Sequence, residues 1–540
     1  MPFGIKLTQS QVHKYRCEGQ WGDATLADYW RMAVLCFPDK VAVSDSHGKC
    51  FTYRETDCAA DKVAAFLIKT GVCPGDFVSV QLPGWAEFAV IYAACLKVGA
   101  VINPILPNFQ LHELSYILNK CESKVLFMPV RFRKQDYLSN ISPLKTDVPS
   151  LKKIVAVEKE DETAGQLTLS KILEPFAPAA GYRLRRADDL AAVLFTSGTE
   201  GFPKGVMLTH NNIIASERAF CANFHLDYLD KIFMPAPVAH AIGFHHGVTA
   251  SFMLGATCLL EDVYCAEEAV RLITEECCSI AMASTPVVYD LIRCLHEQKR
   301  TLPSLHVFLC GGSAVPRMLL QQALTVGLRI MSIYGSTESV PHTAAKPDDP
   351  ADLLLTDGCA LPGIEIKVVD KSRKEVDSGT EGEEASRGPN VFVGYLKEPD
   401  LTAKVLDDDG WYYSGDLCRQ DPRGYIRITG RMKDIIIRGG ENISSAEVEW
   451  ILMQHPNVSE ASVVGMPDKR LGERSCAYVV LKNPAKGLTL PEVQKFFRCL
   501  HVAKYKYPER IEVVGQLPHT ASMKVKKYIL RKDIRRKMQN

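Results

Sequence analysis

Between about Leu26 and Val315 the sequence alternates short apolar runs with longer segments of helical periodicity. The apolar runs read KVAVSD, FVSVQL, AVINPI, KVLFMP, KKIVAV, AVLFT, SIAMAS and VFLCGG, and they alternate with segments such as EFAVIYAACLKVG and AEEAVRLITEE. Parallel strands are buried on both faces and need helical crossovers, so their sequences are continuously apolar and are separated by helices. The pattern therefore predicts an α/β fold of doubly wound, largely parallel sheets with helices on their faces.

The residue pattern changes after about Met331, where shorter strand-like runs and turn residues become frequent, and it changes again after Arg431. Segments such as GIEIKVVDKSRKEVDSGTEGEEASRGP and YIRITGR predict a β-rich subdomain, and the C-terminal segments mix helix and strand patterns. We expect a large N-terminal domain of residues 1–431, with the β-rich subdomain at about 340–431, and a small α+β domain of residues 432–540.

Composition limits the classes of function. The chain of 540 residues has a formal net charge of +1 at pH 7, so it carries no general attraction to nucleic acid or to anionic membranes. Its 18 cysteines are scattered without CxxC or metal-ligand spacing, which favours reduced thiols. The N-terminal sequence lacks the basic and apolar regions of a signal peptide. We expect a soluble cytoplasmic enzyme, either a monomer or a homodimer.

Two further segments bear on membrane contact. The longest apolar stretch, FAVIYAACLKVGAVINPIL, is interrupted by Lys97 and Gly99, so it predicts a helix followed by a strand and no transmembrane segment. The C-terminal segment KVKKYILRKDIRRKM is strongly basic. A solvated helix face is the commonest explanation of such a run, and contact with nucleotide phosphates or with anionic lipid at a membrane periphery is the alternative.

Residues 195–210 read FTSGTEGFPKGVMLTH, a loop of hydroxyls, glycines and one lysine directly after an apolar strand. Glycines let backbone N–H groups turn toward a polyphosphate, and the lysine supplies a point charge. The loop is not a Walker A sequence, because Lys204 precedes Gly205 and no Gly-Lys-Ser/Thr closes it. A nucleotide phosphate site and a structural turn both remain open from this loop alone.

Further polar segments follow strand patterns. YGSTES brings Tyr334, which could flank a purine, close to Glu338, whose carboxylate suits Mg²⁺. GWYYSGDLC presents Asp416 in a glycine-flanked turn, where a carboxylate can accept both hydrogens of a ribose diol. GRMKDIIIRGGENISSAEVE and HTASMKVKKYILRKD complete the series. An ordinary surface turn would explain any one of them in isolation.

Taken in this order, the segments resemble the adenylate-forming superfamily of acyl-CoA synthetases, luciferases and peptide-synthetase adenylation domains, over nearly the whole chain. FTSGTEGFPKGVMLTHNN, YGSTES, GEEASRGPNVF and RGGENISS are most similar to the short- and medium-chain fatty acyl-CoA synthetases of enteric bacteria. The resemblance implies that the chain joins a fatty acid to coenzyme A at the expense of ATP, with Mg²⁺ as cofactor. The reaction would pass through an acyl-AMP and release AMP and pyrophosphate.

The resemblance also implies a set of nucleotide-binding residues. The expected phosphate loop contains Thr196, Ser197, Gly198, Thr199, Gly201 and Lys204. The expected adenine site contains Gly311, Gly312, Ser313 and Tyr334. Asp416 and Arg431 would bind ribose, and Glu338 and Thr199 would hold Mg²⁺.

Catalytic roles follow from the same resemblance. His240 would lie beside the acyl carboxylate, Thr337 would contact the α-phosphate, and Lys524 would reach both during adenylation. Lys433 falls at an expected hinge about which the small C-terminal domain rotates between the two half-reactions. Gly439 and Gly440 would then lie along the pantetheine arm of CoA, although a tight hairpin turn is an equally simple reason for two glycines.

Two positions depart from the pattern of the superfamily. Glu200 stands in the phosphate loop where threonine or serine is common, and we expect its carboxylate to face solvent or the metal without abolishing activity. Met523 stands before Lys524 where glycine is usual. A methionine with positive φ there would be strained by about 1 kcal/mol or more and could misdirect the lysine.

Two other functions fit the same residues. The pocket walls at residues 238–246 and 284–289 are merely apolar, so a cyclic or aromatic carboxylic acid is an alternative substrate. A nucleotide-binding homologue with impaired catalysis is the second alternative, and Met523 is its support. A nucleic-acid ligase is disfavoured by the neutral charge and the absence of KxDG. His245 and His246 lack partners at metal spacing, so we expect them in the acyl-pocket wall.

Overall fold

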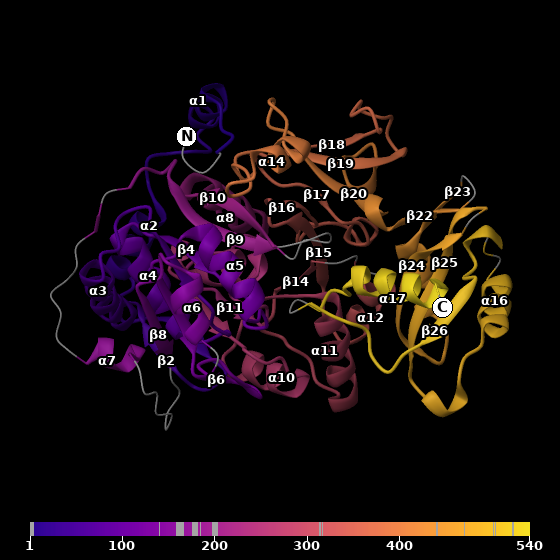
Figure 1. Cartoon of the computed structure of the whole chain (residues 1–540), viewed down its shortest axis with the longest axis horizontal. Coiled ribbons are helices and arrows are strands. Elements are labelled where there is room, and N and C mark those ends of the chain that lie inside the picture. The colour runs from indigo at the N-terminus through magenta and orange to yellow at the C-terminus, as the bar shows by residue number, and fades with distance from the viewer. Residues whose placement is uncertain are drawn as a thin grey trace. The chain divides into compact units, whose positions relative to one another are not determined.

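The computed structural model describes residues 5–139, 141–157, 167–174, 182–183, 185–196, 203–312, 315, 317–438, 441–468, 470–500, 502, 504–520 and 523–539. Contacts between Cα atoms divide the chain into two compact units (Figure 1). The first unit comprises Met1–Gly312, Arg317–Glu365 and Ser386–Tyr412, and the second comprises Ser313–Pro316, Ile366–Ala385 and Tyr413–Asn540. Part of the β-rich segment thus clusters with the C-terminal residues, and the expected functional boundary at residue 431 stays a prediction.

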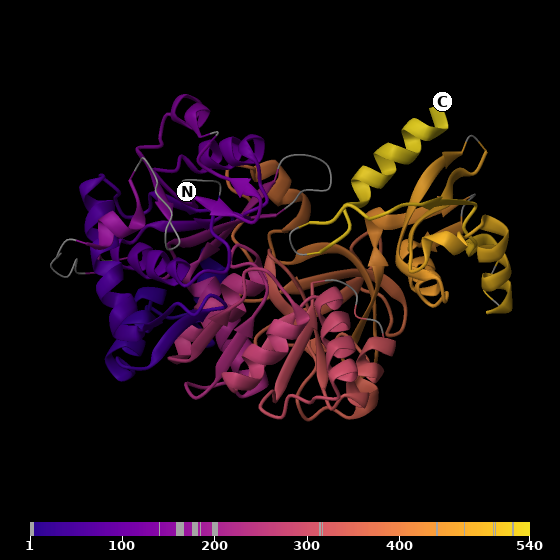
Figure 2. The ribbon, with the colours of Figure 1, turned by 90° about the horizontal axis from the view of Figure 1, so that it is seen from below.

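The first unit contains a nine-stranded sheet whose middle is parallel and whose edges are antiparallel. Its strands, in spatial order, are β17 (Cys359–Ala360), β16 (Ser339–Ala344), β15 (Ile330–Ser336), β14 (Val307–Gly311), β13 (Ile280–Ala283), β11 (Lys231–Met234), β12 (Thr257–Leu260), β1 (Val41–Asp45) and β2 (Cys50–Thr52). Figure 2 shows α10 (Ala266–Glu275), α11 (Thr285–Gln298) and α12 (Arg317–Thr325) side by side along one face. Because the central strands run parallel, their carboxyl ends lie along the same edge of the sheet.

A six-stranded sheet forms the other layer of the first unit. Its strands, in order, are β10 (Lys204–Thr209), β9 (Leu190–Thr196), β4 (Val101–Pro104), β3 (Phe77–Val80), β5 (Val125–Pro129) and β8 (Lys153–Val157). Every residue of β3, β4 and β5 is buried, as their continuous apolar sequences require. Only the β9–β10 pair is antiparallel, which makes these two strands a hairpin around the expected phosphate loop.

The remaining elements of the first unit are helices and one small hairpin. The α-helices are α1 (Gln9–Cys17), α2 (Leu26–Cys36), α3 (Tyr53–Lys69), α4 (Glu87–Val98), α5 (Leu111–Cys121), α6 (Ser142–Asp147), α7 (Leu169–Leu173), α8 (His210–Phe224), α9 (Ala250–Leu254), α13 (Ala351–Leu354) and α14 (Pro399–Val405). The hairpin is β6 (Arg131–Phe132) with β7 (Gln135–Asp136), and η2 (Ile242–Thr249) is a π-helix. Wide helical turns of this kind are rare and concentrate at functional sites.

The second unit contains two antiparallel-rich sheets. The strands of the first sheet are, in order, β18 (Glu365–Val369), β19 (Glu381–Arg387), β20 (Tyr412–Gln420) and β21 (Ile426–Arg431). Glu365, Ser386, Arg387 and Tyr412 of these strands are assigned to the first unit. The second orders β23 (Glu441–Ser444), β22 (Ile435–Arg438), β25 (Gly472–Leu481) and β24 (Val458–Asp468), with β26 (Arg510–Val513) parallel to β25. Short 3₁₀ turns lie at η3 (Met432–Asp434), η4 (Pro484–Lys486) and η5 (Lys504–Lys506).

Helices cover both faces of this second sheet. Helices α15 (Ser445–Met453) and α16 (Leu490–Cys499) pack with Val463 on one face, and α17 (Lys527–Gln539) packs with Val464 on the other. Adjacent residues of a strand point to opposite faces, so one strand serves both cores. The expected small α+β fold is thereby present in the second unit.

The structure confirms the α/β class predicted from the alternating sequence pattern. Each of the eight apolar runs forms a strand, namely β1, β3, β4, β5, β8, β9, β13 and β14, and both helical segments form helices, α4 and α10. The stretch from α4 to β4 is a helix followed by a strand, as predicted. The sequence pattern did not single out β11 and β12, whose short apolar runs adjoin the charged residues Lys231 and Glu261.

Two findings bear on the environment of the chain. None of the helices in the described ranges combines the length and the apolar character that crossing a bilayer requires. All 18 cysteines are unpaired, and burial raises the pKa of several of their thiols, as for Cys258, whose pKa rises to about 12. Such buried thiols are poor nucleophiles and act as small apolar side chains.

The turn η3, which carries Lys433, is fastened to α17 by ion pairs. Lys527 Nζ lies 3.6 Å from the Asp434 carboxylate, and Arg531 donates hydrogen bonds to that carboxylate and, at 3.0 Å, to the carbonyl of Lys433. Burial alone would raise the pKa of Asp434, but the facing Lys527 and Arg531 outweigh burial and hold it below the ordinary value. The expected hinge thus has a charged anchor within its own unit.

We predict that Asp434→Asn destabilises the second unit in a pH-dependent way. Since the pKa of Asp434 is lower in the folded protein, its stabilising contribution is complete above its unfolded pKa of about 4 and is lost as the pH falls through the folded value. At pH 7 the variant should lose about 1–3 kcal/mol of unfolding free energy, the value of hydrogen bonds to a charged group. Urea unfolding at pH 7 and at pH 2.5, below the ordinary pKa of an aspartate, measures this, and an equal loss at both pH values would contradict it.

Candidate functional site

The ends of two neighbouring parallel strands bring the expected adenine-site residues together. Gly311 ends β14 and pairs with Ile333 of β15, directly before Tyr334. A Cβ atom at Gly311 would lie 2.6 Å from the carbonyl oxygen of Ile333, so only glycine permits this approach. The ring of half-buried Tyr334 packs edge-on against His342, with ring centroids 5.0 Å apart. The two strand ends thus bring the buried backbone of Gly311 and the half-buried backbone of Gly312 close to an aromatic ring, an arrangement that suits a purine.

A tight hairpin presents Thr337 and Glu338. Ser336 of β15 pairs with Ser339 of β16, so the two site residues form the turn between the strands. Asn390 fixes the far side of this turn, because its buried amide donates to Ser339 Oγ at 3.1 Å and to the carbonyl of Pro341 at 3.0 Å. The turn is therefore held from outside as well as by its own strands.

Tyr395 connects Glu338 with the phosphate-loop hairpin. Thr196 and Lys204 face each other across β9 and β10, which places the two ends of the loop side by side. The Lys204 ammonium lies 5.3 Å from the centroid of the Tyr395 ring, and the Tyr395 hydroxyl donates a 2.8 Å hydrogen bond to Glu338 Oε1. Burial raises the pKa of Tyr395 and the Glu338 carboxylate raises it further, so the phenol keeps its proton and remains a donor.

Sequence reasoning missed Tyr395. The segment GEEASRGPNVF stops short of it, and the continuation VGYL reads as an ordinary apolar run. The available signal was the preceding residue, Gly394, which marks a local break in an otherwise strand-like pattern. Its partner in space, Glu338, is 57 residues away in sequence, and no local pattern reports such a contact.

His240 stands at the entrance to the π-helix η2. The backbone N–H of Ile242 donates to His240 Nδ1 at 3.2 Å, so in the neutral ring the proton lies on Nε2. The carbonyl of Pro237 accepts a 2.9 Å bond from the His240 N–H. The ring is half-buried and held from its Nδ1 side, and a proton on Nε2 makes that atom a donor of the kind that a carboxylate accepts.

The second unit brings Asp416 and Arg431 together. These residues face each other across β20 and β21, and Arg431 Nε lies 2.7 Å from Asp416 Oδ1. Asp416 is 5% exposed, and its backbone N–H donates a 3.1 Å hydrogen bond to Ser414 Oγ. The guanidinium thus orients the carboxylate, and the pair expected to bind ribose exists as an ion pair.

Lys524 follows a tight turn that begins at Thr520. The Lys524 N–H donates to Thr520 Oγ1 at 3.0 Å, and the Thr520 N–H donates to the Lys524 carbonyl at 2.7 Å. Closing this turn requires a left-handed residue, and Met523 supplies it with φ of 61°. The expected strain at Met523 is therefore present, although the turn is closed and Lys524 is half-buried.

Several expected site residues lie outside the described ranges. They are Ser197, Gly198, Thr199 and Gly201 of the phosphate loop, Ser313 of the adenine site, and Gly439 and Gly440 of the expected pantetheine contact. Glu200, the unusual carboxylate of the loop, lies outside them too. Their roles stay predictions.

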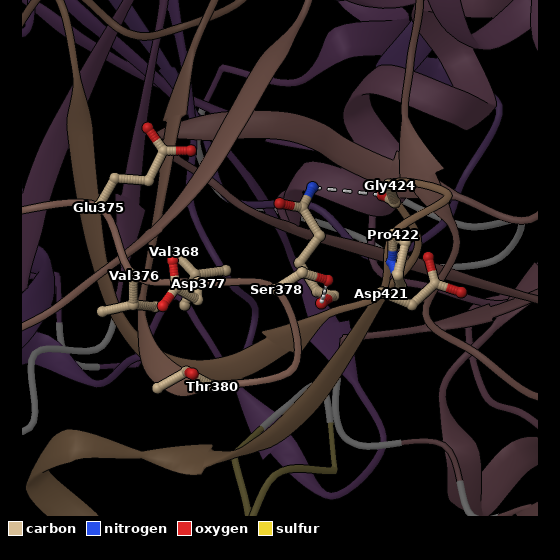
Figure 3. A pocket seen from close by; sticks show the side chains of 10 residues that line it. Val368, Glu375, Val376, Asp377, Ser378, Thr380, Asp421, Pro422 and Gly424 are labelled. Atoms are coloured by element: carbon tan, nitrogen blue, oxygen red, sulfur yellow. Dashed lines mark hydrogen bonds between the residues drawn. The ribbon is translucent and has the colours of Figure 1, made fainter.

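A cavity of about 260 Å³ in the second unit contains none of the expected site residues (Figure 3). Its lining includes Glu375, Asp377 and Asp421 and no basic side chain, so it would repel a phosphate. Within the first unit, Gly311, Tyr334 and Glu338 instead lie at neighbouring strand ends and in the turn between β15 and β16.

The donor chemistry of the strand-end site suits Mg²⁺. The part of the chain that the structure describes holds no group of three or more His, Cys, Asp or Glu side chains that could bind a metal by themselves. Mg²⁺ commonly takes only one or two carboxylates and completes its shell with water and substrate phosphates. Glu338, fixed through one oxygen by Tyr395, is a carboxylate of that kind.

We predict that Met523→Gly stabilises the protein slightly. A left-handed backbone costs a non-glycine residue about 1–2 kcal/mol, and the extra freedom of glycine in the unfolded chain takes back roughly 0.5–1 kcal/mol. A net gain on the order of 0.5–1 kcal/mol should appear as a raised urea midpoint. Met523→Ala is the matched control, because it keeps a Cβ atom and should gain nothing. A destabilised glycine variant would show that the methionine side chain contributes more than its backbone costs.

The chain is also similar in sequence to known proteins. The AMP-binding enzyme family matches residues 30–396, and the AMP-binding enzyme C-terminal domain matches residues 447–524. The chain is 52% identical over 539 residues to the medium-chain fatty-acid–CoA ligase of Escherichia coli (strain K12), covering 100% of this chain and 95% of that protein. It is 30% identical to the 2,3-dihydroxybenzoate-AMP ligase of Bacillus subtilis (strain 168), covering 97% and 96%.

A solved structure gives the same result. The crystal structure of ATP-bound MatB from Rhodopseudomonas palustris superimposes with a TM-score of 0.84 at 26% identity, covering 94% of this chain and 99% of that one. The family match spans most of the chain, and it includes the described strand ends at Gly311 and Tyr334. The chain belongs to the AMP-binding enzyme family, the adenylate-forming superfamily that its sequence motifs indicate.

Proposed function

We propose that the protein is an ATP-dependent fatty acid:CoA ligase for short- to medium-chain acids, which releases AMP and pyrophosphate. The observation that carries the proposal is the 52% identity over 539 residues to a medium-chain fatty-acid–CoA ligase. The strand-end geometry supports it, because Tyr334, Glu338 and Lys204 occupy positions that suit adenine and phosphates. We further propose that it works in the cytoplasm on soluble ATP and CoA, as a monomer or homodimer.

The chemistry explains the residues. A carboxylate resists attack by a thiol because an oxide is a poor leaving group, so one carboxylate oxygen first attacks the α-phosphorus of ATP and expels pyrophosphate. Negative charge builds on the α-phosphate during this step, and preorganised donors stabilise it. We assign this to Thr337 and Lys524, while His240 orients the acid through its Nε2–H. Mg²⁺ held by Glu338 would neutralise phosphate charge when bound.

The second half-reaction has different requirements. The thiol of CoA attacks the acyl carbonyl and loses its proton. The C–O bond between the acyl group and the phosphate then breaks, and AMP leaves. A cation aimed at the α-phosphate is no longer needed for pyrophosphate departure. We therefore assign Lys524 to the first half-reaction alone, with Lys433 at the hinge that changes the surroundings between the two steps.

We predict that Lys524→Ala abolishes acid-dependent pyrophosphate release and spares thioester formation from preformed acyl-AMP. Removing one preorganised charge contact should slow adenylation by about 100-fold or more. Lys526→Ala is the matched control, because it removes a neighbouring lysine and should keep full activity.

The assay uses fatty acids from short to long, with benzoate and cyclohexanecarboxylate, in the presence and absence of CoA. Release that peaks with a fatty acid of one length supports the proposal. Preference for a ring acid would replace fatty acids as the substrate class. ATP binding without release on any acid would identify a catalytically impaired homologue, and restored release in Met523→Gly would trace the loss to the strained turn.

We also predict that Tyr395→Phe raises the KM for ATP by about three- to tenfold, because Glu338 loses its orienting hydrogen bond. The phenylalanine ring still lies under Lys204, so the cation contact survives. Tyr137→Phe is the control, since that buried hydroxyl donates to the carbonyl of Pro107 at 2.7 Å, away from these residues. An unchanged KM in Tyr395→Phe would remove Tyr395 from the nucleotide site.

A further inference from the structure

A buried charged cluster joins α8 to η2, the π-helix that begins two residues after His240. Glu217 of α8 is fully buried, and its two carboxylate oxygens face the Nδ1 atoms of two adjacent histidines. His245 Nδ1 lies 3.3 Å from Oε1, and His246 Nδ1 lies 3.0 Å from Oε2. The Ser216 hydroxyl donates to Oε1 at 2.8 Å. Burying a carboxylate is costly, so an arrangement that satisfies both of its oxygens calls for an explanation.

The carboxylate fixes both rings in one orientation. Burial opposes ionisation of Glu217, but the facing His246 and His245 outweigh burial and lower its pKa to about 2. An ionised carboxylate only accepts hydrogen bonds, so both Nδ1 atoms must carry protons. The other ring nitrogen of His245 is buried and has no hydrogen-bond partner among the described residues. Glu217 is therefore the polar anchor of that ring.

The π-helix explains how two adjacent side chains reach one carboxylate. In an α-helix successive side chains diverge by about 100° around the axis. The wider π-helical turn of η2 reduces this divergence, and His245 and His246 both turn toward α8. On its other side, η2 packs tightly against backbone, because a Cβ atom at Gly243 would lie 2.3 Å from the Pro237 carbonyl oxygen. The helix is thus held between Glu217 and residues 236–237.

His240 depends on the placement of this helix. Its Nδ1 accepts the N–H of Ile242, the first residue of η2, and its carbonyl accepts the Phe244 N–H at 2.9 Å. A shift or rotation of η2 therefore moves the imidazole and the direction of its Nε2–H. A misplacement of about 1 Å at a reacting group can cost up to 100-fold in rate.

We propose that Glu217 is a positioning residue for the acid: through His245 and His246 it fixes η2, and through η2 it sets the orientation of His240. The inference rests on the proposed function, in which His240 orients the acyl carboxylate. The nucleotide residues lie on other elements, β10, β14 and β15, so the effect should fall on the acid and spare ATP.

The test is a set of matched variants measured with acid and ATP varied separately. Glu217→Gln keeps the volume of the side chain but leaves one acceptor oxygen for the two imidazoles and the Ser216 hydroxyl. We expect kcat/KM for the acid to fall about tenfold, while the KM for ATP changes less than twofold. Asp61→Asn is the control for a damaged buried ion pair, because Asp61 Oδ1 lies 2.6 Å from Lys97 Nζ, which is 3% exposed. This control variant should lower the urea midpoint of unfolding without a selective fall in kcat/KM for the acid.

A double-variant cycle separates positioning from stability. If Glu217 acts through His240, then Glu217→Gln should cost nothing further in kcat/KM once His240→Ala is present. Additive losses would overturn the proposal. Should Glu217→Gln fail to fold, His246→Asn and His246→Leu replace it, because the asparagine amide can still donate to Glu217 and the leucine cannot. Full acid activity in His246→Leu would also overturn the proposal.

A measurement without substrate keeps this inference apart from the proposed function. Histidines labelled at Cε1 give NMR signals, and the His240 signal is assigned by its loss in His240→Ala. Glu217→Gln should shift that signal, whereas Asp61→Asn should leave it unchanged. A wild-type protein that activates no acid would refute the proposed function, and an unmoved His240 signal would refute the positioning role whatever the substrate.

Discussion

The geometry of the strand-end site depends on one short segment, residues 388–396. Main-chain hydrogen bonds join this segment to strand β10 and to the turn that carries Glu338. The Leu396 N–H donates to the Gly205 carbonyl at 2.8 Å, and the Phe392 N–H donates to the Glu338 carbonyl at 2.8 Å. Backbone bonds have fixed directions and little freedom. The spacing between the β9–β10 hairpin and the turn that carries Glu338 is therefore set by the fold, before any side chain contributes.

Much of the fold could be predicted because its physics is local. A strand buried on both faces must be apolar throughout, so β3, β4 and β5 are visible in the sequence as uninterrupted runs. The order of strands within each sheet is different in kind. It depends on which crossovers pack best, and the neighbours β11 and β12, which lie in the middle of the larger sheet, are also its least conspicuous strands.

The candidate site divides in the same way. Gly311, Tyr334 and Asp416 could be named from the sequence, because they belong to the motifs that resemble the superfamily. Tyr395 and Glu217 could not, since each looks ordinary within its own segment and matters only through a partner. The partners of Glu217 lie 28 and 29 residues away on another helix, and a polar residue on a helix is far more often solvated than buried.

The buried cluster at Glu217 is hard to explain by stability alone. Apolar residues of similar volume often replace a buried ionic group without loss, and sometimes with a gain in stability. A leucine at position 217 would fill the space, but it would place no constraint on the rotation of two neighbouring imidazoles. The carboxylate supplies direction where apolar packing supplies only volume. In the role proposed for His240 the π-helix η2 must keep one orientation, and η2 is the element that this carboxylate contacts.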